Sequence, residues 1–429
     1  MNYKQRLIVP RDEKALWTVL KNKNRGIQCH LQPIHSESML RNVYVGKVRD
    51  IVPNIHAAFV DLGNGKQGFY SLDSNPSHLF TNTLDVDEEK TLFSSRKLRP
   101  GDEILVQVER EAVKTKDPVL TSCLNITGRY AVLTAGKPGL GISAKIQDKN
   151  WKKEAQEKFS PFCSEEIGFI LRTNAIYASF DEICYEMDYL RNQFFSILKK
   201  GRFSSCFSLV YEDDPPYLSL LRDYNLDYLD AIITDQKDIY DSIQIYLDQH
   251  IKQKTDEKDM FENKPEVQTD RHVLRYYQDD LLPLYKLESL HELLGDALKK
   301  KVWLKSGGYL VIEPTEALTV IDVNTGKNSG KKSPRETIRN LNLEAAHAVG
   351  EQIRLRNISG IILIDFIDMA YQQDDDDLLK EMQSIVFQDP VKTTVVDMTP
   401  LHLMELTRKK MERPLAEQAK ICGFFEKND

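Results

Sequence analysis

The chain has 429 residues, of which 41% are hydrophobic and 29% charged, and its formal net charge is −7. This length allows about three domains, and this composition excludes a disordered chain. No apolar run approaches the ~18 residues of a membrane span, no signal peptide is recognisable, and six cysteines without CxxC spacing favour a reducing cytoplasm.

The first third of the chain is predicted to form mainly short strands. We expect a strand over 6–9 and a helix from Asp12 or Glu13. Strands on both sides of the Gly63-Asn64-Gly65 turn, and another after a polar loop over about 81–99, are typical of a small β-barrel such as an OB-fold.

The middle of the chain mixes strands and helices. Residues 124–211 combine short strands with a helical stretch around 186–198, and Asp213-Asp214-Pro215-Pro216 is predicted to mark a boundary. Residues 217–300 have an α/β pattern, within which the polar stretch 252–270 is expected to be an exposed connection. The last stretch, 407–429, is polar and poorly patterned.

Two apolar runs near the C-terminus each end on an aspartate. In ALTVIDVNTG the apolar residues are followed by Asp322, and in GIILIDFIDM they are followed by Asp365. Between them, a capping box that begins at Ser333 and apolar residues at helical spacing predict a helix, which ends before Gly360. A strand–helix–strand connection favours parallel neighbours, whose C-terminal ends meet at the ligand-binding edge of an α/β sheet.

Two neighbouring carboxylates repel unless one is protonated or a cation lies between them. Carboxylate oxygens suit Mg²⁺ or Mn²⁺ better than zinc, and such a metal could activate water beside a phosphate. Asn324 lies on the same side of an extended chain as Asp322 and could orient it, and Asp368 is a further candidate for the outer shell. The alternative, that each aspartate only caps a loop or helix, stays open.

Positive charge is concentrated around the first aspartate. From Lys299 to Arg356 there are eleven Lys and Arg against six Asp and Glu, a local excess of +5 on an acidic chain. This clustering indicates a polyanion such as nucleic acid as a partner, or alternatively a solvated helix face.

Several segments resemble the ribonuclease E/G family. They are KVWLKSGGYLVIEPTEALTVIDVNTGK, NLEAA, RLRNISGIILIDFIDM, FILRTNA and YVGKVRDIVPNIHAAFVDLGNGKQGFY. The resemblance implies an Mg²⁺-dependent endoribonuclease that prefers single-stranded RNA and acts in rRNA and tRNA processing and mRNA decay. From the cysteine pattern and the lack of a long apolar run, we expect a cytoplasmic protein with no membrane partner.

The family architecture implies a multidomain α/β protein. The implied domains are an RNase H-like domain (1–37 and 217–297), an inserted OB-fold (38–123), a 5′-sensor region (124–216), a DNase I-like catalytic domain (298–405) and a degenerate zinc-link tail (406–429).

By the same resemblance, Asp322 and Asp365 are the catalytic and metal-binding pair, and Asn324 orients Asp322. The other implied site residues bind RNA or the 5′-phosphate: Phe59, Phe69 and Lys116 for RNA, and Arg172, Thr173 and Lys392 for the phosphate. From the residues alone, a barrel-core role for both phenylalanines and a surface ion pair for the arginine stay open.

Two positions depart from the family pattern. Lys392 replaces the second phosphate-sensing arginine and keeps the charge without the bidentate fork, so we expect weaker discrimination of the 5′ end. Only Cys422 remains of the CPxC-type zinc link, so zinc and a zinc-linked dimer are not expected, although a homo-oligomer stays open. The alternative function is a catalytically weak RNA-binding scaffold of the same fold.

Overall fold

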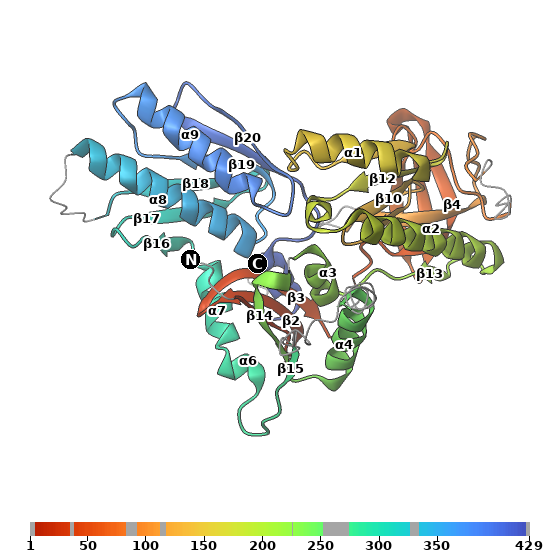
Figure 1. The fold of residues 1–429 in the computed structure, drawn as a ribbon, viewed down its shortest axis with the longest axis horizontal. Helices are drawn as coiled ribbons and strands as arrows, with labels where there is room; N and C mark the ends of the chain where they lie inside the picture. Colours follow the sequence, from red (N-terminus) through yellow and green to blue (C-terminus); the bar gives the residue numbers. More distant parts are fainter. Residues whose placement is uncertain are drawn as a thin grey trace, which may run out of the picture. The chain divides into compact units, whose positions relative to one another are not determined.

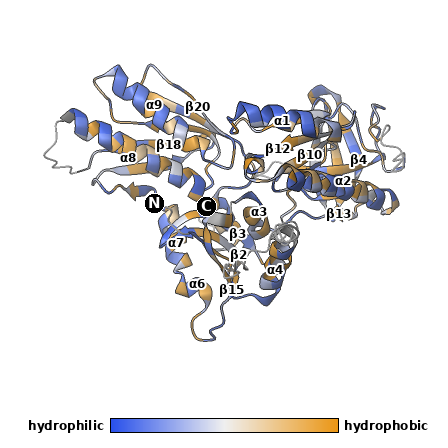
Figure 2. Cartoon of the chain, viewed as in Figure 1, coloured by the Kyte–Doolittle hydropathy of each residue, from blue (hydrophilic) through white to orange (hydrophobic). Residues whose placement is uncertain are grey.

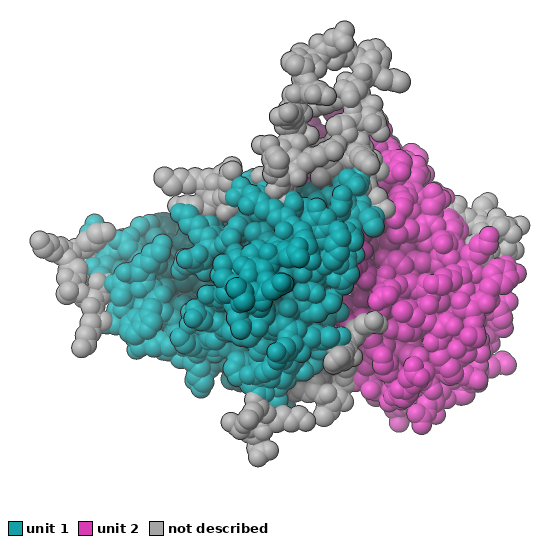
Figure 3. All heavy atoms as spheres, turned by 90° about the horizontal axis from the view of Figure 1, so that it is seen from below, with its two compact units in different colours: residues 1–37, 226–429 teal, residues 38–225 magenta. Residues whose placement is uncertain are grey.

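The computed structural model describes residues 5–34, 38–82, 92–111, 117–224, 226–251, 274–326 and 334–425 of a mixed α/β protein. The chain forms two compact units, residues 1–37 with 226–429 and residues 38–225, coloured separately in Figure 3. The finer division into named domains remains a prediction. Within the described ranges, no helix has both the length and the apolar character that crossing a bilayer requires.

The second unit begins with a closed five-stranded barrel. The strands are ordered β4-β5-β6-β8-β7, and β7 pairs back onto β4. Their bounds are Val43–Val52 (β4), Ala57–Gly63 (β5), Lys66–Ser71 (β6), Glu103–Arg110 (β7) and Val119–Thr121 (β8). The predicted turn between β5 and β6 is present, with Asn64 and Gly65 in the left-handed region. This closed barrel fits the expected OB-fold class.

A four-stranded sheet, ordered β11-β12-β10-β9, completes the second unit. Helix α2 packs against β10, and a capping box between Ser179 and Glu182 begins this helix. The bounds are Asn125–Thr127 (β9), Ala131–Ala135 (β10), Gly139–Ile142 (β11), Lys149–Phe159 (α1), Ile167–Leu171 (β12), Phe180–Phe203 (α2), Leu209–Tyr211 (β13, which pairs with β4) and Pro216–Asp223 (α3).

The first unit contains a five-stranded sheet ordered β15-β14-β1-β2-β3. The helix expected from Asp12 is wrong, because Asp12 accepts the N–H groups of Lys14 and Ala15 in a turn that leads into a strand. The bounds are Gln5–Ile8 (β1), Ala15–Asn22 (β2), Arg25–Pro33 (β3), Leu229–Thr234 (β14), Lys237–Ile251 (α4), Leu274–Tyr276 (β15), Leu284–Leu287 (α6) and Leu290–Leu298 (α7).

The stretch from Thr407, which is poorly patterned in the sequence, is structured as far as residue 425. Thr407 belongs to a strand, and helix α10 (Leu415–Ile421) packs against β3. The side-chain oxygen of Gln418 accepts the backbone N–H of Leu31 at 2.9 Å. Tertiary packing therefore supplies the order that periodicity did not predict.

The second sheet of this unit is ordered β16-β17-β18-β19-β21-β20. Helices α8 and α9 lie side by side across it, and their mixed hydrophilic and hydrophobic residues fit helices with one buried side (Figures 1 and 2). The bounds are Lys301–Trp303 (β16), Tyr309–Pro314 (β17), Leu318–Asn324 (β18), Pro334–Leu355 (α8), Gly360–Asp365 (β19), Gln372–Phe387 (α9), Thr393–Met398 (β20) and Leu403–Arg408 (β21).

Candidate active site

The two aspartates that end the apolar runs are direct neighbours. Strands β18 and β19 pair in parallel, as the strand–helix–strand pattern predicted, and the register matches Asp322 with Asp365. Paired residues on adjacent strands lie about 5 Å apart across the sheet and point to the same face. Asp322 is half-buried and Asp365 is exposed, so both carboxylates can reach a ligand from solvent.

The electrostatics of the pair show mutual repulsion. Partial burial raises the pKa of Asp365 above its ordinary value, and the negative charges of Asp322 and Asp368 raise it further. Asp368, which follows β19 in the loop, therefore contributes to the same negative field. A cation between the carboxylates would relieve this repulsion.

An amide fixes the first carboxylate. The Asn324 side-chain Nδ2 donates a hydrogen bond of 2.7 Å to Asp322 Oδ2. The two residues are separated by one position on β18, so they share a face of the strand. This bond restricts the rotation of Asp322 and leaves its other oxygen available to a ligand.

A second asparagine fixes the loop after β19, and sequence reasoning missed it. Asn342 of α8 is fully buried. Its Nδ2 donates to the Ile367 carbonyl at 2.8 Å, and its Oδ1 accepts the Ile367 N–H at 3.2 Å. The helix thereby holds the backbone between Asp365 and Asp368. A lone Asn on an apolar helix face is the sequence signal that could have identified it.

The donor set fits a magnesium ion. Mg²⁺ is commonly bound by one or two carboxylates, keeps several waters and takes its remaining oxygens from substrate phosphates. Asp322 and Asp365 supply that pair. Across the described ranges, no group of three or more His, Cys, Asp or Glu side chains is arranged to hold a metal ion.

The predicted RNA-binding aromatics lie on the barrel. Phe59 and Phe69 are register partners on β5 and β6, and their rings meet edge to face with centroids 6.1 Å apart. Both rings are half-buried, whereas the adjacent Ala58, Val60 and Tyr70 fill the barrel core. The alternative that the two phenylalanines are core residues therefore does not hold. Lys116 lies outside the described residues.

The predicted phosphate-binding arginine already has partners. Arg172 Nη1 donates to the Gly128 carbonyl at 2.7 Å and to Asp223 Oδ1 at 2.8 Å. Thr173 Oγ1 lies 3.0 Å from Ser143 Oγ. An ion pair is thus present, as the alternative interpretation allowed. Among the described residues, both side-chain contacts of Arg172 use the same nitrogen, Nη1.

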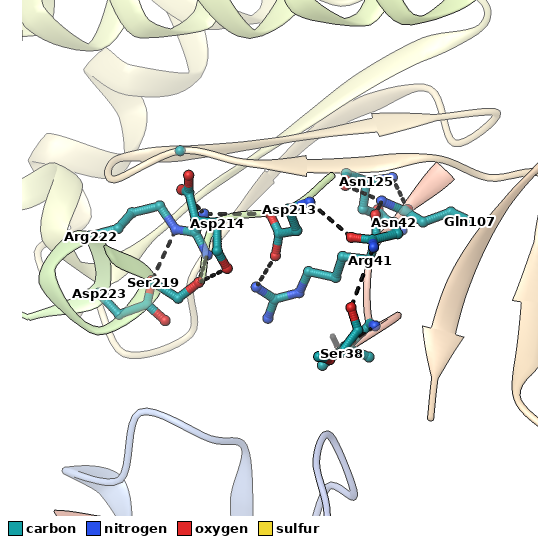
Figure 4. Close-up of polar contacts among 12 residues, drawn as sticks. Ser38, Arg41, Asn42, Gln107, Asn125, Asp213, Asp214, Ser219, Arg222 and Asp223 are labelled. Carbon is teal, nitrogen blue, oxygen red and sulfur yellow. Dashed lines mark hydrogen bonds and ion pairs between the residues drawn. The ribbon is translucent and has the colours of Figure 1, made fainter. Parts of the chain in front are cut away.

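Asp223 belongs to a network that sequence reasoning did not identify. Figure 4 shows it beside the buried Arg222, whose Nη1 donates to Asp214 Oδ2 at 2.9 Å. Burial would raise the pKa of Asp223, but the guanidinium groups of Arg172, Arg222 and Arg41 outweigh burial and lower it. Asp223 is therefore a carboxylate that holds Arg172 in place. Asp223 lies 51 residues from Arg172 in the chain, so the local sequence pattern does not predict this ion pair.

The two positions that depart from the family pattern lie in the first unit. Lys392 is exposed just before β20, and its carbonyl accepts the Lys409 N–H at 3.0 Å. Cys422 is buried in the core cluster that includes Trp17 and Leu415. Burial, with a smaller contribution from Asp12, raises the pKa of the Cys422 thiol to about 11.

A closed five-stranded barrel and a sheet with paired carboxylates define a mixed α/β protein with a two-acid site. A family model described as the Ribonuclease E/G family matches residues 125–411, and the chain belongs to this family.

Curated relatives agree with this assignment. Ribonuclease G from Salmonella typhimurium (strain SL1344) is 31% identical over 404 residues, which cover 91% of this chain and 79% of that protein. Ribonuclease G from Escherichia coli (strain K12) matches with the same identity and coverage. Ribonuclease E from Nostoc sp. (strain PCC 7120 / SAG 25.82 / UTEX 2576) is 31% identical over 379 residues, which cover 88% of this chain and 52% of that protein.

Proposed function

We propose that this chain, an endoribonuclease by its family, hydrolyses phosphodiester bonds of single-stranded RNA with Mg²⁺ held by Asp322 and Asp365. The single observation that supports this mechanism is the register match of the two aspartates on one face of the sheet. The products are a 5′-phosphate and a 3′-hydroxyl. Precursors of rRNA and tRNA, and mRNA, are the proposed substrates.

The residues around the pair have distinct roles in this proposal. When bound, Mg²⁺ supplies an acidified water and neutralises charge on the phosphate. Asn324 holds Asp322 in its ligating orientation, and Asn342 holds the loop that follows Asp365. Asp322 and Asp365 bind only in their ionised forms, so the raised pKa of Asp365 makes binding sensitive to acid.

RNA is held on the other unit in this proposal. The outward rings of Phe59 and Phe69 stack on unpaired bases. Arg172 and Thr173 bind a 5′-monophosphate through charge-assisted hydrogen bonds. The family resemblance also assigns a role in phosphate sensing to Lys392. The proposed domain names follow the family: an RNase H-like part, an OB-fold, a 5′-sensor region and a DNase I-like catalytic part. We also propose that the enzyme works in the cytoplasm.

A short 5′-phosphorylated oligoribonucleotide tests the mechanism. We expect the protein to cut it with Mg²⁺, to stop in EDTA, and to lose cutting in Asp365→Asn while binding persists. Asp280→Asn is the matched control and should cut normally, because Asp280 is an exposed aspartate in the segment between β15 and α6. Binding by the unaltered protein without Mg²⁺-dependent cutting would instead identify a scaffold.

A further inference from the structure

Among the described residues, helices α8 and α9 pack on one face of the six-stranded sheet of the first unit. Alternate residues such as Leu310, Ile321 and Ile362 are buried in the core beneath α8 and α9. The residues between them point to the opposite face and are half-buried or exposed. We call this opposite side the open face. It carries Asp322, Asn324 and Asp365.

The open face also carries an aromatic and cationic cluster at its β16 edge. The register pairs Trp303 with Tyr309, and Tyr309 with Asn324. Lys301 lies two positions before Trp303 and therefore points to the same face. Two strand spacings, about 10 Å, separate β16 from β18. Trp303, Tyr309 and Asn324 thus form one row across the sheet that ends beside the carboxylates.

The cluster is assembled by its own contacts. The Lys301 Nζ lies 4.0 Å from the centroid of the Trp303 ring and 3.5 Å from that of Tyr309. The two rings meet edge to face with centroids 5.3 Å apart. The ammonium group thus holds the rings in place through cation–π contacts. Even so, 63% of Trp303 is exposed, and the packing of this sheet does not require an indole at that position.

We propose that Lys301, Trp303 and Tyr309 form a stacking platform for an unpaired RNA base next to the bond that is cut. The exposed indole offers a ring face to a base, and the lysine offers positive charge to the neighbouring phosphate. The platform shares one continuous face with Asp322 and Asp365, so a strand bound at the carboxylates reaches it. This inference rests on the proposed nuclease function.

Fluorescence can test the platform without cleavage. The chain has three tryptophans; Trp17 is fully buried and Trp151 is half-buried, so Trp303 is the most exposed. In EDTA, we expect a single-stranded 5′-hydroxyl oligoribonucleotide to quench tryptophan emission, and Trp303→Phe to remove that quenching. Trp303→Ala should weaken RNA binding about tenfold, as expected for the loss of one stacked base. Trp303→Phe should retain most of the affinity.

The chain offers a matched control. Tyr276, 43% exposed, lies with Tyr240 and Lys237 in a similar aromatic and cationic cluster on the other sheet of this unit. Tyr276→Ala should bind RNA as the unaltered protein does. The experiment is repeated with RNAs that lack one base, at a different position in each. At one position only, Trp303→Ala should bind as tightly as the unaltered protein, because the base that stacks on Trp303 is already missing.

Three outcomes would overturn the platform. The first is that Trp303→Ala binds RNA with unchanged affinity. The second is that Trp303→Ala weakens binding equally for every position of the abasic site. The third is that Trp303→Ala changes the oligomeric mass of the protein but not its RNA affinity. The last would mean that a second copy covers the open face. Because binding is measured in EDTA, a protein that binds RNA on Trp303 but never cuts would refute the nuclease mechanism while leaving the platform intact.

Discussion

Asn324 donates its side-chain amide to Asp322 across 2.7 Å, so the residue that orients the first carboxylate lies on the same strand as that carboxylate. Asn324→Ala removes the donor and frees Asp322 to rotate. We expect cleavage to fall by about 10- to 100-fold, the usual cost of losing a partner of a metal ligand. The Mg²⁺ concentration for half-maximal cleavage should rise as well. Gln373→Ala, on the exposed surface of α9, is the control; a loss in both variants would show only general damage.

The raised pKa of Asp365 predicts a stability effect that depends on metal. The folded protein binds a proton at this carboxyl more strongly than the unfolded chain does, so its contribution to stability is lost as pH rises from the ordinary value of 3.8 through the raised pKa. In EDTA at neutral pH, Asp365→Asn should therefore melt at the same or a higher temperature. Mg²⁺ should raise the Tm of the unaltered protein but not of this variant. Equal Mg²⁺ stabilisation of both would place the ion elsewhere.

The same pKa shift predicts how activity responds to acid. Protons and Mg²⁺ compete for Asp365, so cleavage should fall as pH drops through the raised pKa of this group. Raising the Mg²⁺ concentration should move the acidic limb of the pH–rate profile to lower pH. An acidic limb that does not respond to Mg²⁺ would show that a different group controls it.

Asn342 should contribute to both stability and catalysis. Asn342→Asp can still accept the Ile367 N–H, but it cannot donate to the Ile367 carbonyl when ionised. We expect a loss of about 1–3 kcal/mol, the penalty of a buried polar group without its partner, measured by urea unfolding. Asn342→Leu should lose similar stability. If the loop position matters to the reaction, both variants should also need more Mg²⁺ when assayed well below their melting temperatures.

Arg172 and Asp223 allow phosphate binding to be separated from structural support. Arg172→Gln should equalise the cleavage rates of 5′-monophosphate and 5′-hydroxyl RNA, because the cation that binds the phosphate is gone. Asp223→Asn also breaks the ion pair but keeps the guanidinium. It should retain the preference for the monophosphate. Loss of the preference in both variants would show that Arg172 cannot sense the phosphate unless Asp223 holds it in place.

A substitution at Lys392 should increase the preference for 5′-monophosphate RNA. Lys392→Arg restores a planar fork at this exposed position. The ratio of monophosphate to hydroxyl cleavage rates should increase, while hydroxyl cleavage stays unchanged. A ratio that does not change would show that Lys392 has no role in sensing the phosphate.

Much of the catalytic sheet could be predicted from the sequence because its signals are local. Apolar runs that end on Asp322 and Asp365, with a helical pattern between them, define a crossover whose strands lie in parallel, and the register confirms this. The helix expected from Asp12 failed because the turn made by the Asp12 side chain competes with helix initiation there. Order beyond Thr407 was missed because α10 depends on packing against β3 rather than on its own periodicity.

The sequence by itself therefore determined the paired acids and the neighbour that orients one of them, since strand alternation and the strand–helix–strand connection act over short distances. The class of the protein came from the resemblance of whole segments to the ribonuclease E/G family. Only the tertiary structure decided which distant side chains meet: Asp223 with Arg172, Asn342 with the loop after β19, and Trp303 with the row that leads to Asn324. Each of these contacts depends on strand register or on helix packing, and neither leaves a periodic trace in the chain.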